Sequence, residues 1–275
     1  MISFSHIVNP VPAGEESDLF TAQPITFATM RAARDFSRDI AGADVRLYAV
    51  QLAGEEEVRV PAVFQRLPGL SRSVGDLKEF ATRRKLPLIR DILQALYEAD
   101  DADYMIYTNA DIALQPNFYW TAARMIERGH DAFAVNRRTI PAHYRDTGAI
   151  PLMYAELGQE HKGWDCFVFP RAMYPRFRLG LACIGAGWLG RVLLTNMACL
   201  AAHFRVFTDL HLTFHVGNET AWRAQRFSDY LAHNRAEWHR VFLEFARERG
   251  PFDRGAIPGC FLDFFERQAA RESRK

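Results

Sequence analysis

A carboxylate that follows a buried strand is the first residue whose position suggests chemistry. Residues 104–108 alternate so that both faces of the segment are largely apolar, which is typical of a short central strand buried on both sides. The triplet Asn109–Ala110–Asp111 would then lie at the carboxyl end of that strand, where open α/β sheets bind ligands. A divalent metal carrying a diphosphate would compensate the charge of Asp111 there. The alternative is a turn in which Asp111 caps the next segment.

A histidine late in the chain is the second candidate metal ligand. His211 and His215 are four residues apart, but His-Glu-x-x-His is absent and the β-branched and aromatic neighbours favour an extended segment. Both side chains would then share one face. His215 is followed by the flexible Gly217 and is better placed to reach a metal. The alternative is a structural histidine in the core.

An aspartate between aromatic residues is a candidate catalytic group. Asp165 stands in the segment Gly163–Trp164–Asp165–Cys166–Phe167. Desolvation raises the pKa of a carboxyl group, which suits a general base or an acceptor for a substrate hydroxyl. The alternative is a buried aspartate paired with one of the many arginines.

A glycine-rich segment supports a different function. Residues 185–190 match G-x-G-x-x-G, and Asp209 follows about twenty residues later, as in a dinucleotide-binding site. Against this interpretation, Trp188 is bulky where a pyrophosphate must approach closely, and little α/β sequence follows. An NAD- or FAD-dependent oxidoreductase using this loop is therefore the alternative function.

Basic residues near the ends of expected elements could bind phosphate groups. One set lies near the first and third helices, and a pair follows a later strand: Arg31, Arg83, Arg84, Lys85, Arg90, and Arg137–Arg138. Most surface charges are merely solvated, but those after strand ends could face a diphosphate.

The elements that must position these residues follow an α/β pattern. Strand, helix and strand near the start have the spacing of a βαβ unit with a parallel pair. We expect irregular structure at 1–24, 61–76 and 140–163, the last as a lid on the acceptor side. The remaining predictions are strands at 25–29, 45–50, 104–108, 131–135 and 164–169, extended pieces at 205–209 and 210–214, and helices at 30–40, 87–98, 118–128, 189–204 and 227–249.

Length and composition narrow the function classes. The 275 residues suit one α/β domain with a small extension. A formal net charge of +1 makes no electrostatic case for nucleic acid. The four cysteines are scattered, without Cys-x-x-Cys, so we expect reduced residues and no structural zinc. We see no signal peptide and no apolar stretch of transmembrane length, so a cytoplasmic protein is expected, with peripheral membrane association left open.

Taken in order, these residues resemble the GT-A-fold glycosyltransferases, the nucleotide-diphospho-sugar transferases. The resemblance covers roughly residues 24–222. It implies a GT-A-like domain at 1–225, with a mixed, mostly parallel central sheet flanked by helices, and a C-terminal helical extension at 226–275. The motifs that carry it are Thr29 with Arg31, the segment Lys85–Asp91, the D-x-D-like Asn109–Asp111, Gly163–Asp165, and Asp209 with Thr213–His215.

The resemblance also implies roles for individual residues. Asp111 and His215 would hold a divalent metal on the diphosphate of a nucleoside-diphosphate sugar, and mixed ligation favours Mn²⁺ over Mg²⁺. Asp165 would be the catalytic or acceptor-side acid. Asn109 replaces the first Asp of the family motif, which motivates a further alternative, a catalytically silent sugar-nucleotide-binding protein. The expected substrate-binding residues are Thr29, Arg31, Lys85, Arg90, Asn109, Arg137, Arg138 and Trp188.

Overall fold

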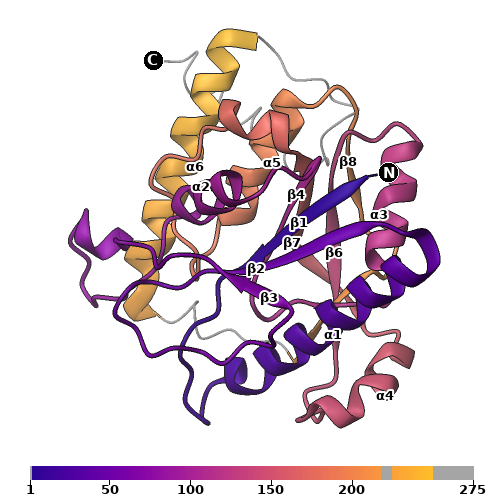
Figure 1. Cartoon of the computed structure of the whole chain (residues 1–275). Helices are drawn as coiled ribbons and strands as arrows, with labels where there is room; N and C mark the ends of the chain where they lie inside the picture. The colour runs from indigo at the N-terminus through magenta and orange to yellow at the C-terminus, as the bar shows by residue number, and fades with distance from the viewer. Residues whose placement is uncertain (1, 218–224, 250–275) are drawn as a thin grey trace.

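A twisted nine-stranded sheet runs through the part of the chain that the computed structural model describes, residues 2–217 and 225–249 (Figure 1). Its order is β3-β2-β1-β4-β7-β6-β9-β5, and β8 pairs with β6. The strands are β1 (Ser3–Val8), β2 (Asp44–Ala49), β3 (Phe64–Arg66), β4 (Tyr104–Thr108), β5 (Ala113–Leu114), β6 (Ala132–Ile140), β7 (Gln159–Pro170), β8 (Phe204–Phe207) and β9 (Thr213–Val216).

Parallel pairs predominate in this sheet. β1, β2, β3 and β4 form parallel neighbours, and β6 is parallel to both β8 and β9. The antiparallel pairs are β4 with β7, β6 with β7, and β5 with β9. The predicted class, a mixed and mostly parallel sheet flanked by helices, is confirmed.

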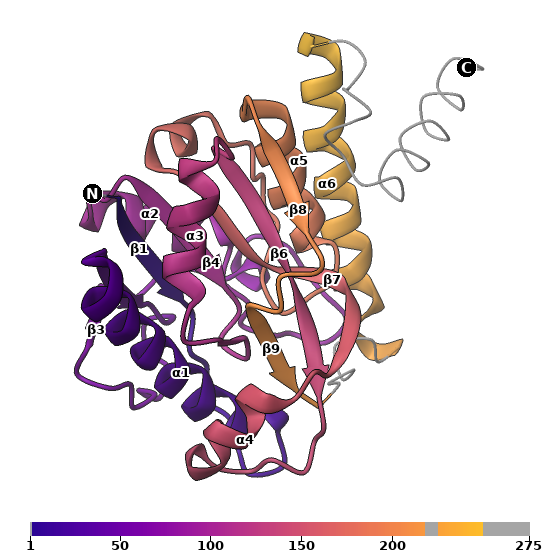
Figure 2. The ribbon, with the colours of Figure 1, turned by 90° about the vertical axis from the view of Figure 1, so that its right-hand side faces the viewer.

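Helices cover both faces of the sheet. α1 and α3 lie on one side, and α5 and α6 lie on the other together with α2 (Figure 2). The helices are α1 (Asp18–Ala41), α2 (Ile89–Ala99), α3 (Phe118–Glu127), α4 (Ile150–Ala155), α5 (Leu189–Leu200) and α6 (Ser228–Arg249), with short 3-10 turns at η1 (Val74–Asp76), η2 (Thr147–Ala149), η3 (Arg171–Arg176) and η5 (Gln225–Phe227).

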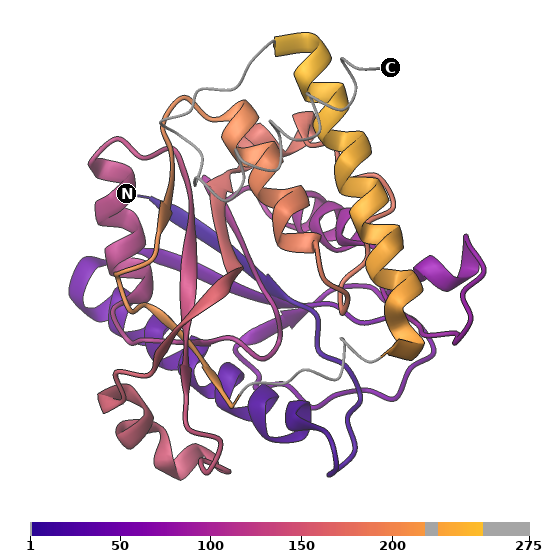
Figure 3. The same cartoon turned by 180° about the vertical axis from the view of Figure 1, so that it is seen from behind.

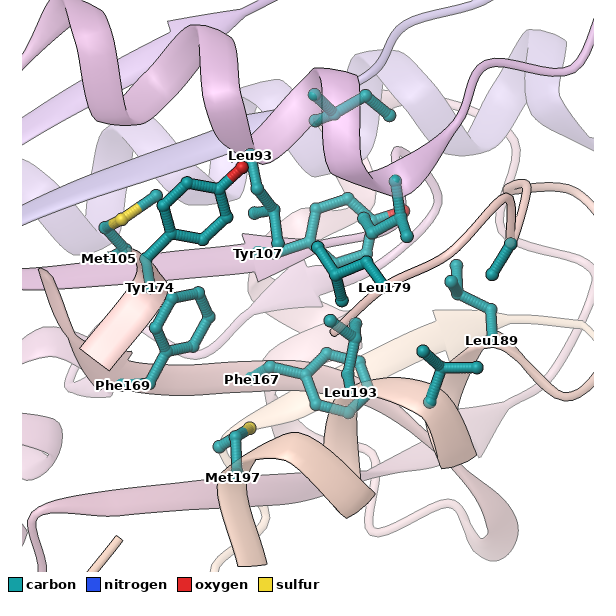
Figure 4. Close-up of a cluster of buried hydrophobic side chains, with 14 of the residues drawn as sticks. Leu93, Met105, Tyr107, Phe167, Phe169, Tyr174, Leu179, Leu189, Leu193 and Met197 are labelled. Atoms are coloured by element: carbon teal, nitrogen blue, oxygen red, sulfur yellow. The ribbon is translucent and has the colours of Figure 1, made fainter. Parts of the chain in front are cut away.

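Side chains that alternate along β4 contribute to the cores on both faces. Met105 and Tyr107 pack with residues such as Phe167 in the cluster beneath α2 and α5 (Figure 4). Ile106 belongs to the cluster on the side of α1 and α3. The prediction of a central strand buried on both faces is confirmed, and the chain leaves this strand directly into the polar triplet.

A strand that the sequence pattern conceals lies in the middle of the parallel region. β1 pairs with β2 on one side and β4 on the other, so the prediction that residues 1–24 are irregular is wrong. His6 interrupts the apolar pattern but is fully buried, with ring nitrogens 2.8 Å from the Tyr119 hydroxyl and 2.9 Å from Thr108 Oγ1. Because both partners lie more than a hundred positions away, local sequence does not reveal them.

The expected first strand is part of a helix. Residues 25–29 lie within α1, so the strand predicted there is wrong. The β-branched residues that suggested a strand belong to the buried face of α1, whose positions recur at helical spacing: Ala22, Ile25, Thr26, Thr29, Met30, Ala33 and Ser37. Packing against the sheet has overridden local propensity. The expected βαβ unit is present, but its first strand is β1.

The other differences concern boundaries. β6 extends to Ile140 and β7 begins at Gln159, so the predicted irregular region 140–163 shrinks to the connection that contains η2 and α4. α5 ends at Leu200, before the predicted residue 204, and β8 and β9 lie within a few residues of the two predicted extended pieces. The predicted loop at 61–76 contains β3 and η1.

α6 packs along α5 on the outside of the sheet (Figure 3). The indole of Trp238 on α6 lies 5.2 Å from that of Trp188 at the start of α5, and Asn234 donates a hydrogen bond to the carbonyl of Gly187. α6 therefore supports the glycine-rich loop. The tail predicted at 251–275 lies outside the described residues. Within the described residues, no helix is long and apolar enough to cross a membrane.

Candidate functional site

A pocket of about 830 Å³ opens at the carboxyl ends of β1 and β4, beside Arg137 of β6 and His215 of β9. Pockets of this size are typical of small-molecule sites, and this edge of an α/β sheet is where they form. Seven of the predicted site residues line it: Lys85, Asn109, Asp111, Arg137, Asp165, Trp188 and His215. The structure thus brings together side chains that are up to 130 positions apart (215 minus 85).

The carboxylate of Asp111 and the imidazole of His215 face each other in this pocket. His215 Nε2 lies 3.2 Å from Asp111 Oδ2, and Nδ1 of the same ring lies 2.8 Å from the carbonyl oxygen of Gly217. Since a carbonyl oxygen only accepts, Nδ1 carries a proton, and Nε2 holds the lone pair when the ring is neutral. Asp111 Oδ1 is buried and has no hydrogen-bond partner.

The two groups hold each other in their charged forms. Burial by itself would raise the pKa of Asp111, but the neighbouring His215 and, more weakly, Arg137 lower that pKa below its usual value. Burial would likewise lower the pKa of His215, but Asp111 raises it above its usual value. The pair therefore favours a proton between Nε2 and Oδ2, and a metal bound there would displace that proton.

This donor set fits a divalent cation with two protein ligands. In residues 2–217 and 225–249, no group of three or more His, Cys, Asp or Glu side chains could hold a metal. One carboxylate and one imidazole, completed by water and a substrate diphosphate, suit Mg²⁺ or Mn²⁺. The fixed contact between His215 Nδ1 and a backbone carbonyl is the support that metal-binding imidazoles usually have. Asp111 Oδ1 supplies a further unpaired oxygen.

A chain of hydrogen bonds leads from β4 to Asp165. The Tyr107 hydroxyl donates to Asn109 Oδ1 at 2.9 Å, and Asn109 Nδ2 donates to Asp165 Oδ1 at 3.3 Å. Burial raises the pKa of Tyr107 far above neutrality, so its hydroxyl remains a donor. Asn109 therefore positions Asp165.

Arg137 on β6 is the charge partner of Asp165. Its Nη1 lies 3.3 Å from Asp165 Oδ2, and both side chains are mostly buried. The approach has the distance of an ion pair but lacks the geometry of a hydrogen bond, since Asp165 Oδ2 and Arg137 Nε are both buried without a hydrogen-bond partner. Both interpretations of Asp165 apply: it is paired with an arginine, and it lines the pocket. Unpaired buried polar atoms are rare in proteins, and their presence in this pocket is typical of a ligand site.

The glycine-rich segment forms one wall of the pocket and does not form a dinucleotide loop. Residues 171–188 contain η3 and turns, so no strand leads directly into the loop as a dinucleotide site requires. Trp188 adopts a left-handed conformation with φ 75° at the start of α5, and the Arg191 guanidinium lies 4.1 Å from its ring. A Cβ atom on Gly190 would lie 2.9 Å from the carbonyl oxygen of Trp164, so glycine there permits close packing on β7.

Four predicted substrate-binding residues lie outside the pocket lining. Thr29 is buried in α1, where its hydroxyl donates to the Thr26 carbonyl and accepts from the Leu114 amide. Arg31 is exposed on α1, and the half-exposed Arg90 on α2 lies beside Asp91. Arg138 donates to the carbonyls of residues 157 and 158. The structure does not bring these four side chains to the site, because their segments are helical or their donors are used by backbone.

Sequence reasoning missed Asn9, assigned no role to Tyr107, and named Arg84 among the possible phosphate-binding residues without including it in the expected substrate-binding set; all three line the pocket. Asn9 directly follows β1, so it carries the same signal as Asp111, but the strand before it was not recognised. Arg84 stands beside the predicted Lys85. Tyr107 was assigned to the core, and it belongs to both core and pocket because its ring is buried while its hydroxyl reaches Asn109.

Comparisons with known proteins give likenesses of fold. No family model matches the chain, and no curated protein is a significant match. Residues 1–349 of S. aureus TarS, solved with UDP-GlcNAc, are 10% identical with a TM-score of 0.49, covering 90% of this chain and 73% of that one. Glucosyl-3-phosphoglycerate synthase from Mycobacterium tuberculosis, solved with Mn²⁺, UDP-glucose and phosphoglyceric acid, is 12% identical with a TM-score of 0.46, covering 86% and 80%. At these TM-scores and identities, the likenesses assign no family, activity or site residues to this chain.

Proposed function

We propose that this protein is a glycosyltransferase that moves a sugar from a nucleoside-diphosphate sugar to an acceptor and depends on a divalent metal. The observation that carries the proposal is the pair Asp111 and His215, which faces the pocket with an unpaired carboxylate oxygen and a fixed imidazole tautomer. A diphosphate needs a cation beside it, and this pair could hold one. Lys85, which lines the same pocket, would add a positive charge for the phosphates.

Asp165 is the residue we assign to the acceptor. Transfer breaks the bond between the anomeric carbon and a diphosphate oxygen, and it forms a bond to the acceptor hydroxyl oxygen, which gives up its proton. Asp165 would accept that hydrogen bond and proton, while Asn109 and Arg137 hold its carboxylate in place. The bound metal would neutralise negative charge on the leaving diphosphate.

A second candidate function is sugar-nucleotide binding without catalysis. It is favoured by Asn109, whose amide bonds to Asp165 and leaves Asp111 as the one carboxylate of the D-x-D-like motif. An enzyme would slowly hydrolyse the bound sugar nucleotide, whereas a silent binder would not. The release of nucleoside diphosphate, measured over time, distinguishes the two.

The proposed function is tested by thermal shift with UDP-, GDP- and dTDP-sugars, each with and without Mn²⁺ or Mg²⁺, and with NAD and FAD. We expect one sugar nucleotide to stabilise the protein in a metal-dependent manner. Asp111→Asn should abolish that stabilisation, and Asp209→Asn, an exposed aspartate outside the pocket, should preserve it. Stabilisation by NAD or FAD alone, or equal metal-dependent shifts in wild type and Asp111→Asn, would contradict the proposal.

A further inference from the structure

We propose that Arg84 forms a second anion-binding subsite in the pocket, on the side of α6, and that it binds a phosphate or carboxylate group of the acceptor. That the anion belongs to an acceptor rests on the proposed function; that Arg84 binds an anion does not. Arg84 lines the pocket together with the glycine-rich loop and Leu231 of α6. Asp111 and His215, the proposed metal ligands, come from other elements: Asp111 follows β4, and His215 lies on β9.

The backbone at Arg84 is anchored to α6. Its amide donates to the hydroxyl of Tyr230 at 2.7 Å, and that hydroxyl in turn donates to the carbonyl of Thr82 at 2.9 Å. The ring of Tyr230 is fully buried and stacks on Phe80 with centroids 3.9 Å apart. The segment that carries Arg84 is therefore fixed, and a fixed cation can select a ligand.

The guanidinium of Arg84 is held in place, and among the described residues most of its donors have no acceptor. Nη1 donates to the carbonyl oxygen of Gly185 at 3.2 Å, and the group lies 4.4 Å from the ring centroid of Phe227. A guanidinium has five N–H donors in a planar fork. Within residues 2–217 and 225–249 the Gly185 carbonyl is its one hydrogen-bond acceptor, which leaves four of the five donors. Planar forks of this kind bind phosphate and carboxylate through two parallel hydrogen bonds.

Charge pairing also distinguishes Arg84 from its sequence neighbour. In the described residues no carboxylate lies within ion-pair distance of it, whereas its sequence neighbour Arg83 pairs with Asp76 at 2.8 Å. A second guanidinium, that of Arg226, packs on the same Phe227 ring at 4.9 Å and adds positive charge to the same place. Burial lowers the pKa of Arg84, and Arg226 lowers it further, although an arginine stays charged at neutral pH.

A partly buried charge without a counter-ion is unfavourable, and an anion would relieve that cost. Three other charged groups of the pocket have partners of opposite charge within the described residues: Arg137 lies beside Asp165, Asp111 lies beside His215, and Lys85 is near enough to Glu55 to lower the pKa that burial raises. An anion would therefore supply Arg84 with a counter-ion that the described residues do not supply. Since a cation held by Asp111 and His215 would bind the diphosphate of the sugar donor, we assign the anion at Arg84 to the second substrate, the acceptor.

The experiment measures binding of two anionic probes, glycerol 3-phosphate and 3-hydroxypropanoate, by isothermal titration calorimetry, with glycerol as the uncharged control. Each titration is done at constant ionic strength with saturating UDP and Mg²⁺, and again without them. The variants are Arg84→Met, which keeps an unbranched side chain against Phe227, and Arg84→Lys, which keeps the charge without the fork. Arg83→Met is the matched control, because Arg83 is exposed, paired and outside the pocket lining.

We expect at least one anion to bind wild type and Arg83→Met equally while UDP and Mg²⁺ are present. Binding should weaken by at least about tenfold in Arg84→Met and less in Arg84→Lys. The proposal is overturned if neither anion binds wild type, if Arg84→Met keeps wild-type affinity, or if UDP and Mg²⁺ displace the anion. If UDP fails to bind, the titrations without nucleotide still test Arg84, and the proposed function is decided separately by the thermal-shift comparison of UDP-, GDP- and dTDP-sugars.

Discussion

The buried histidine of β1 should make the stability of the whole domain depend on pH. His6 is fully buried, and burial lowers its pKa to about 3 from an ordinary value of 6.5. The native protein therefore leaves this ring neutral at pH values where the unfolded chain protonates it. The contribution of the neutral His6 ring to the free energy of unfolding is fully present above about pH 6.5, and it is lost progressively as the pH falls toward about 3.

The size of the effect follows from linkage. Well between the two pKa values each pH unit costs about 1.4 kcal/mol, so lowering the pH from about 7.5 to about 4.5 should cost about 3 kcal/mol from this ring alone. That is a large part of the roughly 5–15 kcal/mol that stabilises a typical domain. Protonation would make both ring nitrogens donors, so the Tyr119 and Thr108 hydroxyls would both have to accept. Thr108 is the last residue of β4, immediately before Asn109.

The assay compares the pH dependence of wild type with that of His6→Gln. Urea unfolding, followed by tryptophan fluorescence at several pH values between about 7.5 and 4.5, gives the free energy of unfolding of each protein. His6→Gln should be less stable near neutral pH by about 1–3 kcal/mol, because a buried hydrogen-bond partner changes. Its stability should then fall less steeply with acidification, with the slopes differing by about 1.4 kcal/mol per pH unit.

The comparison of slopes cancels the contributions of other titrating groups. His143→Gln is the matched control, since His143 is exposed, and its slope should equal that of wild type. Equal slopes for wild type and His6→Gln would refute the argument, because His6 would then have the same pKa in the folded and unfolded states.

Three further predictions concern the pocket. Asp111→Asn removes the charge of the metal ligand and should weaken metal-dependent sugar-nucleotide binding by at least about tenfold in calorimetry, without loss of the folded circular dichroism spectrum. His215→Ala should weaken the same binding, whereas His211→Ala should not, because His211 lies outside the pocket lining; equal metal affinity in both variants would exclude His215 as a ligand. Asn109→Asp would place a second carboxylate about 3.3 Å from Asp165, so turnover and melting temperature at neutral pH should fall. A gain in Mn²⁺ affinity without those losses would instead show that residue 109 is a metal ligand.

Strands, helices and pocket residues could be predicted from the sequence where the local pattern coincides with the packing of the folded domain. Residues 104–108 alternate, and both of their faces are buried because the sheet has helices on each side. Helices with a clear apolar stripe, such as α2 and α3, were predicted to within a few residues for the same reason. The pocket residues that directly follow strands were found because strand ends on one edge of a sheet converge.

The sequence was insufficient where distant residues determine the outcome. β1 contains serines and a histidine that only tertiary partners make compatible with a buried strand. Residues 25–29 have β propensity, but the helix that contains them buries that face against the sheet and α3. Because Thr29 was placed at a strand end by mistake, a residue of the core was assigned to the site. Arg138 was also assigned to the site, because it lies near the predicted strand end. In the structure its donors bind backbone carbonyls, so it does not reach the pocket.

Asn109 is the position where sequence and structure together say more than either does alone. From the sequence, an amide in place of the first motif carboxylate reads as a weakened metal site. In the structure the amide nitrogen points to Asp165 Oδ1 and its oxygen accepts from Tyr107, so both ends of the side chain are used. An aspartate could accept from Tyr107 but could donate nothing to Asp165, and two carboxylates at that distance would compete for one proton. The amide is thus the side chain that can donate to Asp165, the charge partner of Arg137, while Asp111 remains available to His215 and a cation.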